Sequence, residues 1–309
     1  MAFVLLGLCM ALLRKRDGNL SSIHRSMQNK HSELCACLGI EGRQAVSRSH
    51  LPVLLGKVAV GAFERLLFAR YGIELEPGER PWFAADGKEL RGSIEKGDKR
   101  GEAIVQVVRH GTGEVAAQTY YNGQKESEKT YLKGLLEQSG LHGEKITMDA
   151  LHLSPAMTGL VEGEKGTFII GLKENQAALA AEMRAASQHL PALQQMETLE
   201  KGHGRIDKRC YRHYNIVDCH FDGRWEKARF KSLFKVTRER NELKSGKASQ
   251  ETSYYISNAE PVADGQYFHA IRGHWGVETN NHVRDVTLKE DRLRSKKTNS
   301  QGQWPPQGH

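Results

Sequence analysis

Two aspartates in this chain of 309 residues each come directly after an apolar stretch. Asp86 follows "WFAA" in "WFAADGKELRGS" (82–93), and Asp149 follows "ITM" in "EKITMDALHLS" (144–154). Short apolar runs bounded by turn residues predict buried strands, so each carboxylate is expected where a strand ends. If the two strands are neighbours in one sheet, the two carboxylates converge at the same edge.

Glu278 is the candidate for a third acid. It lies in "RGHWGVETNN" on a predicted helix, four residues after His274 and therefore on the same helix face. Hard cations such as Mg²⁺ bind oxygen ligands and keep water and substrate phosphate for their remaining positions. Two such ions ~3.5–4 Å apart can hold the attacking and leaving oxygens of a phosphodiester in line. Three acids from distant parts of the chain could therefore support phosphoryl transfer, whereas a carboxylate pair alone could also serve a glycosidase.

The elements expected to position these acids alternate between strand and helix. After the first strand, two β-forming runs around "HGTGE" predict a hairpin over 103–121. The apolar spacing then predicts, in order, a helix over 127–140, the second acid-bearing strand, a short helix in "SPAMTGLVEGE", a strand over 166–176 and a helix over 176–190. This order begins with three strands and continues with helices and strands in alternation. It is the pattern of an α/β fold with a mixed sheet flanked by helices.

Changes in composition divide the chain into five parts. The apolar residues of "LPVLLGKVAVGAFERLLFARYGI" (51–73) have the helical spacing of three and four, and Pro77 and Pro81 mark the end of this helical region. The final stretch, "TNSQGQWPPQGH", has no apolar periodicity and two adjacent prolines, which exclude a continuing helix. The predicted parts are an N-terminal helical domain (1–80), the first part of a catalytic core (81–190), a basic insertion (191–250), the last strand and glutamate helix of the core (251–297) and a disordered tail (298–309) with the character of a truncated or frame-shifted end.

Positive charge is concentrated in one segment. The chain has a formal net charge of +8, and residues 201–250 contain 14 Lys and Arg against 6 Asp and Glu, a difference that equals the whole net charge. A local basic block predicts a polyanionic partner, most often a nucleic acid. On charge alone, a solvated lysine-rich surface is the alternative. A neutral sugar substrate has no use for such a block, which argues against the glycosidase interpretation.

Membrane, secretory and disulfide-rich classes lack support in the sequence. The best apolar run, residues 3–13, is shorter than the ~20 residues that cross a bilayer, and its positive charges follow it instead of preceding it. The five cysteines are odd in number, and no C-x-x-C occurs. We therefore expect a cytoplasmic protein with no membrane association, no disulfide framework and no structural zinc.

Five motifs together resemble those of the DDE-type insertion-sequence transposases of the H-repeat-associated group. They are "FAADGKELRGS", "ITMDALHLS", "FIIGLKENQ", "HGRIDKR" and "IRGHWGVETNNHVRDVTLKED", and they occur here in the family's order. The resemblance covers about residues 45–297 and extends more loosely over the helical N-terminal region. It implies an RNase H-like catalytic core, in which a mixed sheet flanked by helices is interrupted by an insertion before the glutamate helix.

The resemblance also implies roles for individual residues. Asp86, Asp149 and Glu278 match the three catalytic acids, which in this family hold Mg²⁺ or Mn²⁺ for DNA cleavage by water and strand transfer by a freed 3′-hydroxyl. Thr279 stands where the family usually has asparagine. DNA contact, or support of the site, is implied for Lys88, Arg91, Lys173, Asn175, Gln176, His203, Arg205, Lys208 and Arg209.

More ordinary roles remain open for three of the motif residues. Lys173 could simply flank a strand, and Asn175 could cap the helix that follows it. Trp275 could pack in the core instead of stacking on a base.

The partner that the resemblance implies is double-stranded DNA, as the terminal inverted repeats of a mobile element and as its target. The implied setting is the bacterial cytoplasm, with nucleoid association, and a homodimer on DNA is compatible with it. The competing class is a non-enzyme, an inactive and truncated transposase remnant that at most binds DNA through its basic insertion. Because of the tail, we expect poor cleavage by the chain as written, with DNA binding retained.

Overall fold

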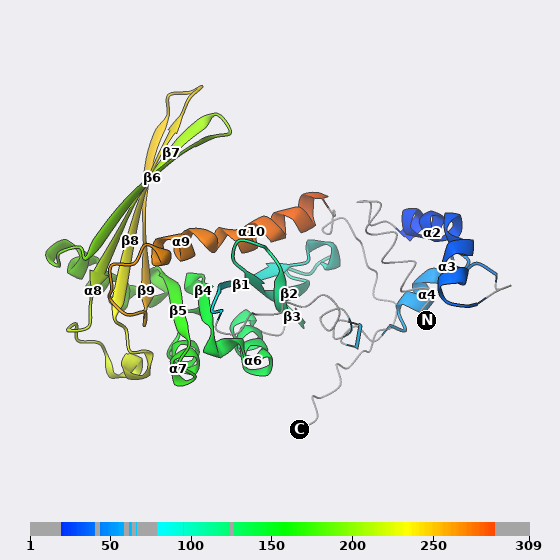
Figure 1. Cartoon of the computed structure of the whole chain (residues 1–309), viewed down its shortest axis with the longest axis horizontal. Helices are drawn as coiled ribbons and strands as arrows, with labels where there is room; N and C mark the ends of the chain where they lie inside the picture. Colours follow the sequence, from blue (N-terminus) through cyan, green and yellow to red (C-terminus); the bar gives the residue numbers. More distant parts are fainter. Residues whose placement is uncertain are drawn as a thin grey trace.

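The computed structural model describes residues 20–40, 44–58, 62–63, 66, 79–94, 96–123 and 127–287. A mixed sheet of nine strands runs through the main body in the order β3-β2-β1-β4-β5-β9-β8-β7-β6, and helices cover both of its faces (Figure 1). The architecture is the predicted α/β class, consistent with an RNase H-like core. The predicted tail 298–309 lies outside these ranges. No helix within them is long and apolar enough to span a membrane.

Three short helices precede the sheet in the described ranges: α2 (Leu20–Asn29), α3 (His31–Cys37) and α4 (Leu51–Leu55). Buried Ile23 and Met27 of α2 pack with Leu51 of α4 in a small apolar cluster. These helices fall within the predicted helical domain, of which most of 59–78 lies outside the described residues.

The first part of the sheet has the predicted order of elements. They are β1 (Trp82–Glu89), β2 (Glu102–Arg109), β3 (Val115–Asn122), α6 (Glu128–Ser139), β4 (Lys145–Met148), α7 (Pro155–Gly163), β5 (Thr167–Leu172) and α8 (Ala177–His189). β2 pairs antiparallel with β1 and β3, whereas β4 is parallel to both β1 and β5. β2, β4 and β5 are buried on both faces, which explains why their sequences are mostly apolar instead of alternating.

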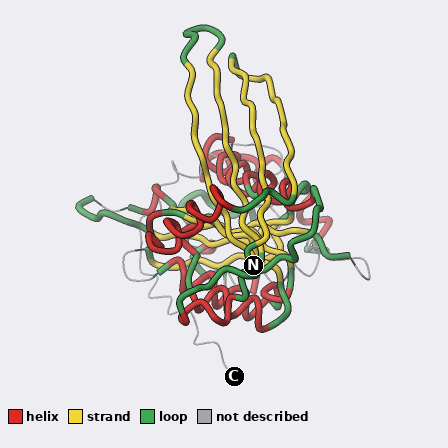
Figure 2. Tube along the Cα trace, turned by 90° about the vertical axis from the view of Figure 1, so that its left-hand side faces the viewer, coloured by secondary structure: helices red, strands yellow, loops and turns green. Residues whose placement is uncertain are grey.

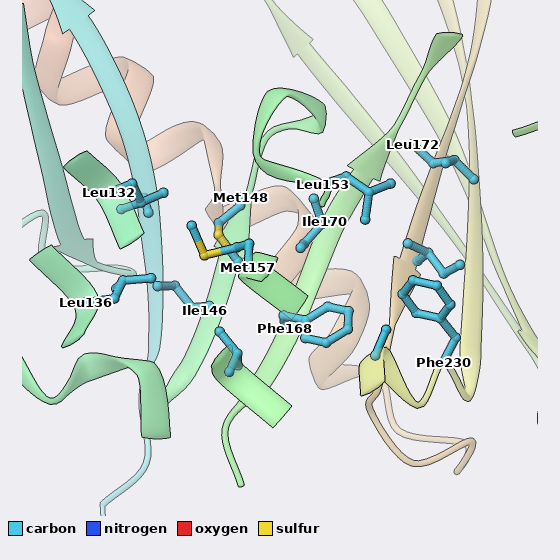
Figure 3. Close-up of a cluster of buried hydrophobic side chains, with 14 of the residues drawn as sticks. Leu132, Leu136, Ile146, Met148, Leu153, Met157, Phe168, Ile170, Leu172 and Phe230 are labelled. Carbon is cyan, nitrogen blue, oxygen red and sulfur yellow. The ribbon is translucent and has the colours of Figure 1, made fainter. Parts of the chain in front are cut away.

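One face of the sheet is covered by α6, α7 and α8. Leu132 and Leu136 of α6 and Met157 of α7 pack against Ile146 of β4 and Phe168 of β5 (Figure 3). These side chains are almost completely buried, and each contributes about 1.5–3 kcal/mol relative to an exposed position. The cluster therefore fixes the helices of this face against the strands that carry the acids.

The other face is covered by α9 (Gln266–Gly273) and α10 (Trp275–His282), and a π-helical turn, Val283–Thr287, follows α10. Val277 of α10 is fully buried and packs on Ala84 of β1 and Val108 of β2. The helix of Glu278 thus rests directly on the strand of Asp86.

Residues 191–250 continue the same sheet. Their strands are β6 (Gln194–Gly202), β7 (Arg205–Asn215) and β8 (Ser232–Glu242), followed by β9 (Ala248–Ser257), which pairs with β8 and β5. The four strands extend beyond the helices as two hairpins, here named the hairpin arm (Figures 1 and 2). The sequence predicts an insertion that ends at 250, but this boundary falls inside β9.

The sequence predicts that β1 ends at Asp86, but in the structure β1 continues to Glu89. The reason is that its two partners differ in length. β4 pairs with β1 only as far as Ala85, opposite Met148, while β2 pairs with it to Glu89. Asp86 is the first residue of β1 beyond the β4 ladder, and Asp149 is the first residue after β4.

Candidate active site

Asp86 and Asp149 lie next to each other at one edge of the sheet. Each follows the last pair of the parallel β1–β4 ladder, Ala85 with Met148, and neighbouring strands are about 4.8 Å apart. Burial, followed by the negative charges of Glu128 and Asp149, raises the pKa of Asp86 to about 7. Adjacent carboxyls in which ionisation is disfavoured are typical of functional sites, because a bound cation relieves the repulsion.

Glu278 reaches the same edge from α10. Burial raises the pKa of Glu278, the Lys173 ammonium lowers it and the Asp149 carboxylate raises it, so Glu278 lies within electrostatic range of both groups. Lys173 follows the end of β5, the strand next to β4. Asp149 thus lies within electrostatic range of both Asp86 and Glu278, and Glu278 also lies within range of the lysine of the "KENQ" motif.

Asn281, three residues after Glu278, connects α10 to Asp86. Its Nδ2 donates to Asp86 Oδ2 at 3.1 Å, and its Oδ1 accepts from Gln106 Nε2 at 2.7 Å. Gln106 lies opposite Asp86 on β2 and is buried. Neither amide belongs to the sequence prediction, although the spacing of Asn281 from Glu278 puts both on one helix face and could have indicated it.

Two further polar contacts hold α10 and its π-helical turn on the sheet. Asn280 Nδ2 donates to the carbonyl of Gly113 at 2.7 Å. Lys88 Nζ lies 2.7 Å from Asp285 Oδ1, and its side chain is only 7% exposed. Lys88 is therefore engaged within the protein, whereas Arg91, also a predicted DNA contact, is exposed in the 3₁₀ turn after β1.

A buried threonine connects two histidines behind the acids. Thr147 Oγ1 donates to the carbonyl of Phe83 and lies 3.0 Å from both His110 Nε2 and His274 Nδ1. Because the hydroxyl has one proton, both histidines must donate to it. Burial lowers the pKa of His110 and of His274 to about 4, so both rings are neutral near pH 7. The histidine of the "HWGVET" motif thus anchors the start of α10 to β4.

Asn175 and Gln176 hold the turn that follows Asp149. Asn175 Nδ2 donates to the carbonyl of Ala150 at 2.6 Å, and Gln176 Nε2 donates to that of Leu153 at 3.0 Å. α8 begins without a side-chain cap, so the cap interpretation of Asn175 is wrong. These contacts favour support of the site over direct DNA contact for the two amides.

Four arginines of the hairpin arm, here named the arginine cluster, surround one buried aspartate, Asp207. Its carboxylate lies 2.9 Å from Arg238, 3.1 Å from Arg240, 3.4 Å from Arg205 and 3.6 Å from Arg209. Burial raises the pKa of Asp207, but hydrogen bonds from Arg238 and Arg240 outweigh this effect and lower it to about 2. One ionised carboxylate among four guanidiniums leaves the cluster positively charged.

Trp275 joins the arginine cluster to the start of α10. It is 44% exposed, so the core-packing interpretation is wrong. The guanidiniums of Arg238 and Arg272 lie 5.7 and 5.2 Å from the centre of its ring. Glu200 of β6 binds both Arg209 and Arg272. The positive arm and the helix of Glu278 therefore share a continuous surface.

The remaining predicted contacts lie in different places on the arm. His203 and Gly204 form the two-residue turn between β6 and β7, and both have positive φ, 50° and 73°. This conformation is typical of hairpin turns, so turn geometry alone accounts for "HG". Lys208 is next to Arg209 on β7 and therefore points to the opposite face, where it lies 3.3 Å from Glu197.

The donor set fits a hard divalent cation. No three His, Cys, Asp or Glu side chains in the described ranges already stand at metal-binding distance from a common point. Asp149 lies within electrostatic range of both Asp86 and Glu278, and the pKa values of these two acids are raised by burial and by neighbouring acids. Carboxylate oxygens in an environment short of positive charge are suitable ligands for Mg²⁺ or Mn²⁺.

Comparisons with known proteins identify the family to which the chain is similar. The chain matches the family described as Transposase DDE domain over residues 78–304. "Putative transposase YncI" of Escherichia coli O157:H7 is 28% identical over 228 residues, which cover 70% of this chain and 57% of that protein. "H repeat-associated putative transposase YhhI" of Escherichia coli (strain K12) is 28% identical over 224 residues, 70% of this chain and 59% of that protein.

The chain spans less than two thirds of the length of these relatives. Among solved structures, the crystal structure of Streptomyces venezuelae DesVI matches 42% of this chain and 48% of that chain at 6% identity, and its TM-score of 0.19 carries no argument about the fold. The family match covers most of the chain, and its range includes Asp86, Asp149 and Glu278. The chain therefore belongs to the Transposase DDE domain family, in the group that includes the H repeat-associated relative, as the resemblance of its motifs implies.

Proposed function

We propose that this chain catalyses metal-dependent cleavage and transfer of DNA strands for the transposition of an insertion sequence. The observation that carries the proposal is the placement of Asp86 beside Asp149, with Glu278 of α10 within electrostatic range of Asp149. In this scheme water attacks a phosphodiester and releases a 3′-hydroxyl, which then attacks a phosphodiester of the target. Both steps are phosphoryl transfers that depend on positioning and charge neutralisation, without a covalent protein nucleophile.

The three acids would hold Mg²⁺ or Mn²⁺, which when bound supplies charge neutralisation at the phosphate and activation of the attacking hydroxyl. The protein supplies the rest. Asn281 orients Asp86 through a hydrogen bond to Oδ2. Lys173 is within electrostatic range of Glu278, which supports a role in binding a phosphate oxygen of the scissile strand.

The substrate in this proposal is double-stranded DNA, first at the terminal inverted repeats and then at the target. The arginine cluster supports it, because the cluster keeps a net positive charge and reaches the start of α10 through Trp275. Guanidiniums bind phosphate oxygens with directed hydrogen bonds. A homodimer on DNA and location at the bacterial nucleoid are compatible with this substrate.

The proposal is tested by a nicking assay and a DNA-binding assay on the element's own ends. We expect slow, Mg²⁺-dependent nicking by the parent chain, because of its tail, and loss of this activity in Asp86→Asn, Asp149→Asn and Glu278→Gln. DNA binding by these variants should remain within about threefold, because it depends on the arm. Glu137→Gln, on the exposed side of α6, is the matched control. Binding without nicking in either Mg²⁺ or Mn²⁺ would instead identify an inactive remnant.

A further inference from the structure

Glu128, the first residue of α6, is a fourth carboxylate beside the site and has no role in the scheme above. Its carboxylate packs directly against the Cα of Gly87, and a Cβ at position 87 would overlap with it. Gly87 does not have a positive φ, so a larger residue here would meet the Glu128 carboxylate and not an unfavourable backbone conformation. Side chains alternate along β1, so Glu128 backs the strand on the face opposite to the Asp86 side chain.

The same carboxylate also contacts the turn of the second acid. Glu128 Oε1 lies 3.0 Å from Nε2 of His152, the last residue of the 3₁₀ turn that begins after Asp149. His152 is fully buried, and its ring nitrogens lack an aligned hydrogen bond to any described residue. The contact is therefore one of close packing and electrostatics. One side chain thus touches the backbone next to Asp86 and the turn of Asp149.

The first turn of α6 holds Glu128 firmly. Tyr121 Oη donates to Glu128 Oε2 at 3.5 Å, and the Tyr121 ring stacks on Tyr131 of α6 with ring centroids 5.0 Å apart. Leu132 in the next turn is fully buried. A carboxylate in the first turn of a helix is also favoured by the helix dipole. Glu128 is therefore part of the packed structure and not a mobile surface group.

We propose that Glu128 is a positioning residue, a spacer that sets the separation of Asp86 and Asp149 through Gly87 and His152. The proposal rests on the proposed function of these two acids. The ladder between β1 and β4 ends at Ala85, so no strand pairing links the two acids themselves. Glu128 bridges the two segments beyond that point. It acts through its contacts with the protein, without touching the metal or the DNA.

The test is a double-mutant cycle between positions 87 and 128 in the full chain. Gly87→Ala places a methyl group where the carboxylate lies, and we expect about a hundredfold loss of nicking and weaker Mn²⁺ binding, because ~1 Å errors cost about that much. Glu128→Ala should lose about tenfold, and Glu128→Gln, which keeps the shape, should stay within about threefold of the parent. In the double variant Gly87→Ala/Glu128→Ala the methyl occupies the vacated space, so activity and Mn²⁺ affinity should recover about tenfold over Gly87→Ala alone.

Mn²⁺ affinity is measured from the rise in Tm with added metal, a readout that needs no turnover. Glu137→Ala on the same helix is the control and should match the parent. Unchanged Mn²⁺ affinity in Glu128→Ala would overturn the proposal that Glu128 is a spacer. The same conclusion would follow if the double variant had no higher nicking activity and Mn²⁺ affinity than Gly87→Ala alone. If Asp86→Asn and Asp149→Asn also leave Mn²⁺ affinity unchanged, the metal site itself is wrong and both proposals fall. If those two variants lose it while Glu128→Ala keeps it, only the spacer is overturned.

Discussion

At the scale of single residues, the site gathers negative charge where little water can solvate it. Burial is the main reason that the pKa values of Asp86 and Glu278 are raised, and neighbouring acids add to the effect. Without a cation, and at a pH between the ordinary pKa of 3.8 and the folded-chain pKa of about 7, Asp86 is therefore protonated in the folded chain and ionised in the unfolded chain. The arrangement that suits metal binding is unfavourable for the stability of the metal-free protein.

Substitution of Asp86 by Asn should remove this instability. The pKa of Asp86 is about 7 in the folded chain, against an ordinary value of 3.8, so stability falls as pH rises through this window. At about 1.4 kcal/mol per pKa unit, the upper bound of the loss is about 4 kcal/mol. In EDTA, Asp86→Asn should match the parent near pH 4 and be the more stable protein near pH 8. Urea unfolding across this range measures the difference, and parallel curves for the two proteins would contradict the assignment.

Loss of Asn281 should impair nicking far more than DNA binding. Asn281→Ala removes the hydrogen bond to Asp86 and leaves the buried Gln106 amide without its acceptor. We expect about a tenfold to hundredfold lower nicking rate, because Asp86 is no longer oriented. Thr279→Ala on the same helix is the control, since the Thr279 hydroxyl donates back to the Trp275 carbonyl within α10. Equal nicking rates for the two variants would show that Asp86 needs no such support.

The sequence predicts the three acids because strand context selects Asp86 and Asp149, and the motifs select these two and Glu278. It does not predict Asn281, Gln106 or Glu128, because amides and glutamates at such positions are most often surface or capping groups. Their roles arise from contacts between segments far apart in the chain, such as Gln106 with Asn281. Single-sequence patterns contain no information on pairs of that kind.

At the scale of elements, local geometry explains several motif residues without assigning them a substrate contact. His203 and Gly204 occupy a hairpin turn with positive φ, and Lys88 forms an ion pair between β1 and the π-helical turn after α10. The order of strands and helices through α8 follows from local periodicity and was therefore predictable. The continuation of the sheet into the hairpin arm was not, because β5 and β9 pair across more than eighty residues of sequence.

The turn interpretation of "HG" can be separated from a DNA contact. His203→Asn keeps a residue that tolerates positive φ, so stability and DNA affinity should both stay close to those of the parent. Gly204→Ala forces a Cβ into the left-handed region and should cost about 1 kcal/mol. Thermal unfolding and DNA binding are measured on both variants. A large loss of DNA affinity in His203→Asn without loss of stability would restore the DNA contact that the sequence predicts.

At the scale of the whole molecule, net positive charge and catalytic acids occupy neighbouring parts of one sheet. The segment 201–250 contains an excess of eight positive charges, and the structure assigns part of it to the arginine cluster next to α10. Internal pairing with Asp207 and Glu200 orders these side chains. An ordered guanidinium loses less side-chain entropy on binding a phosphate than a free one.

Salt dependence should report the phosphate contacts of the arm. Arg205 is the cluster member with the most exposed side chain, so Arg205→Ala should weaken DNA binding and reduce the log–log salt slope by about 0.9, the value for one phosphate. The other three arginines still compensate Asp207, so the fold should be kept. Lys133→Ala on α6 removes the same charge away from the arm and should leave the slope unchanged. Identical slopes for both variants would mean that the cluster is merely solvated.

The continuity of the sheet has a consequence for how such a protein can evolve. β9 covers the edge of β5, and the rest of the arm covers β9 in turn. Excision of residues 191–250 would remove β6, β7 and β8 and leave the remaining part of β9, which still pairs with β5, as an edge strand with exposed, unpaired backbone groups, a template for aggregation. The arm is therefore not an independent domain that recombination can exchange between proteins. Its strands can lengthen or change charge at their tips, while their bases are inherited together with the catalytic core.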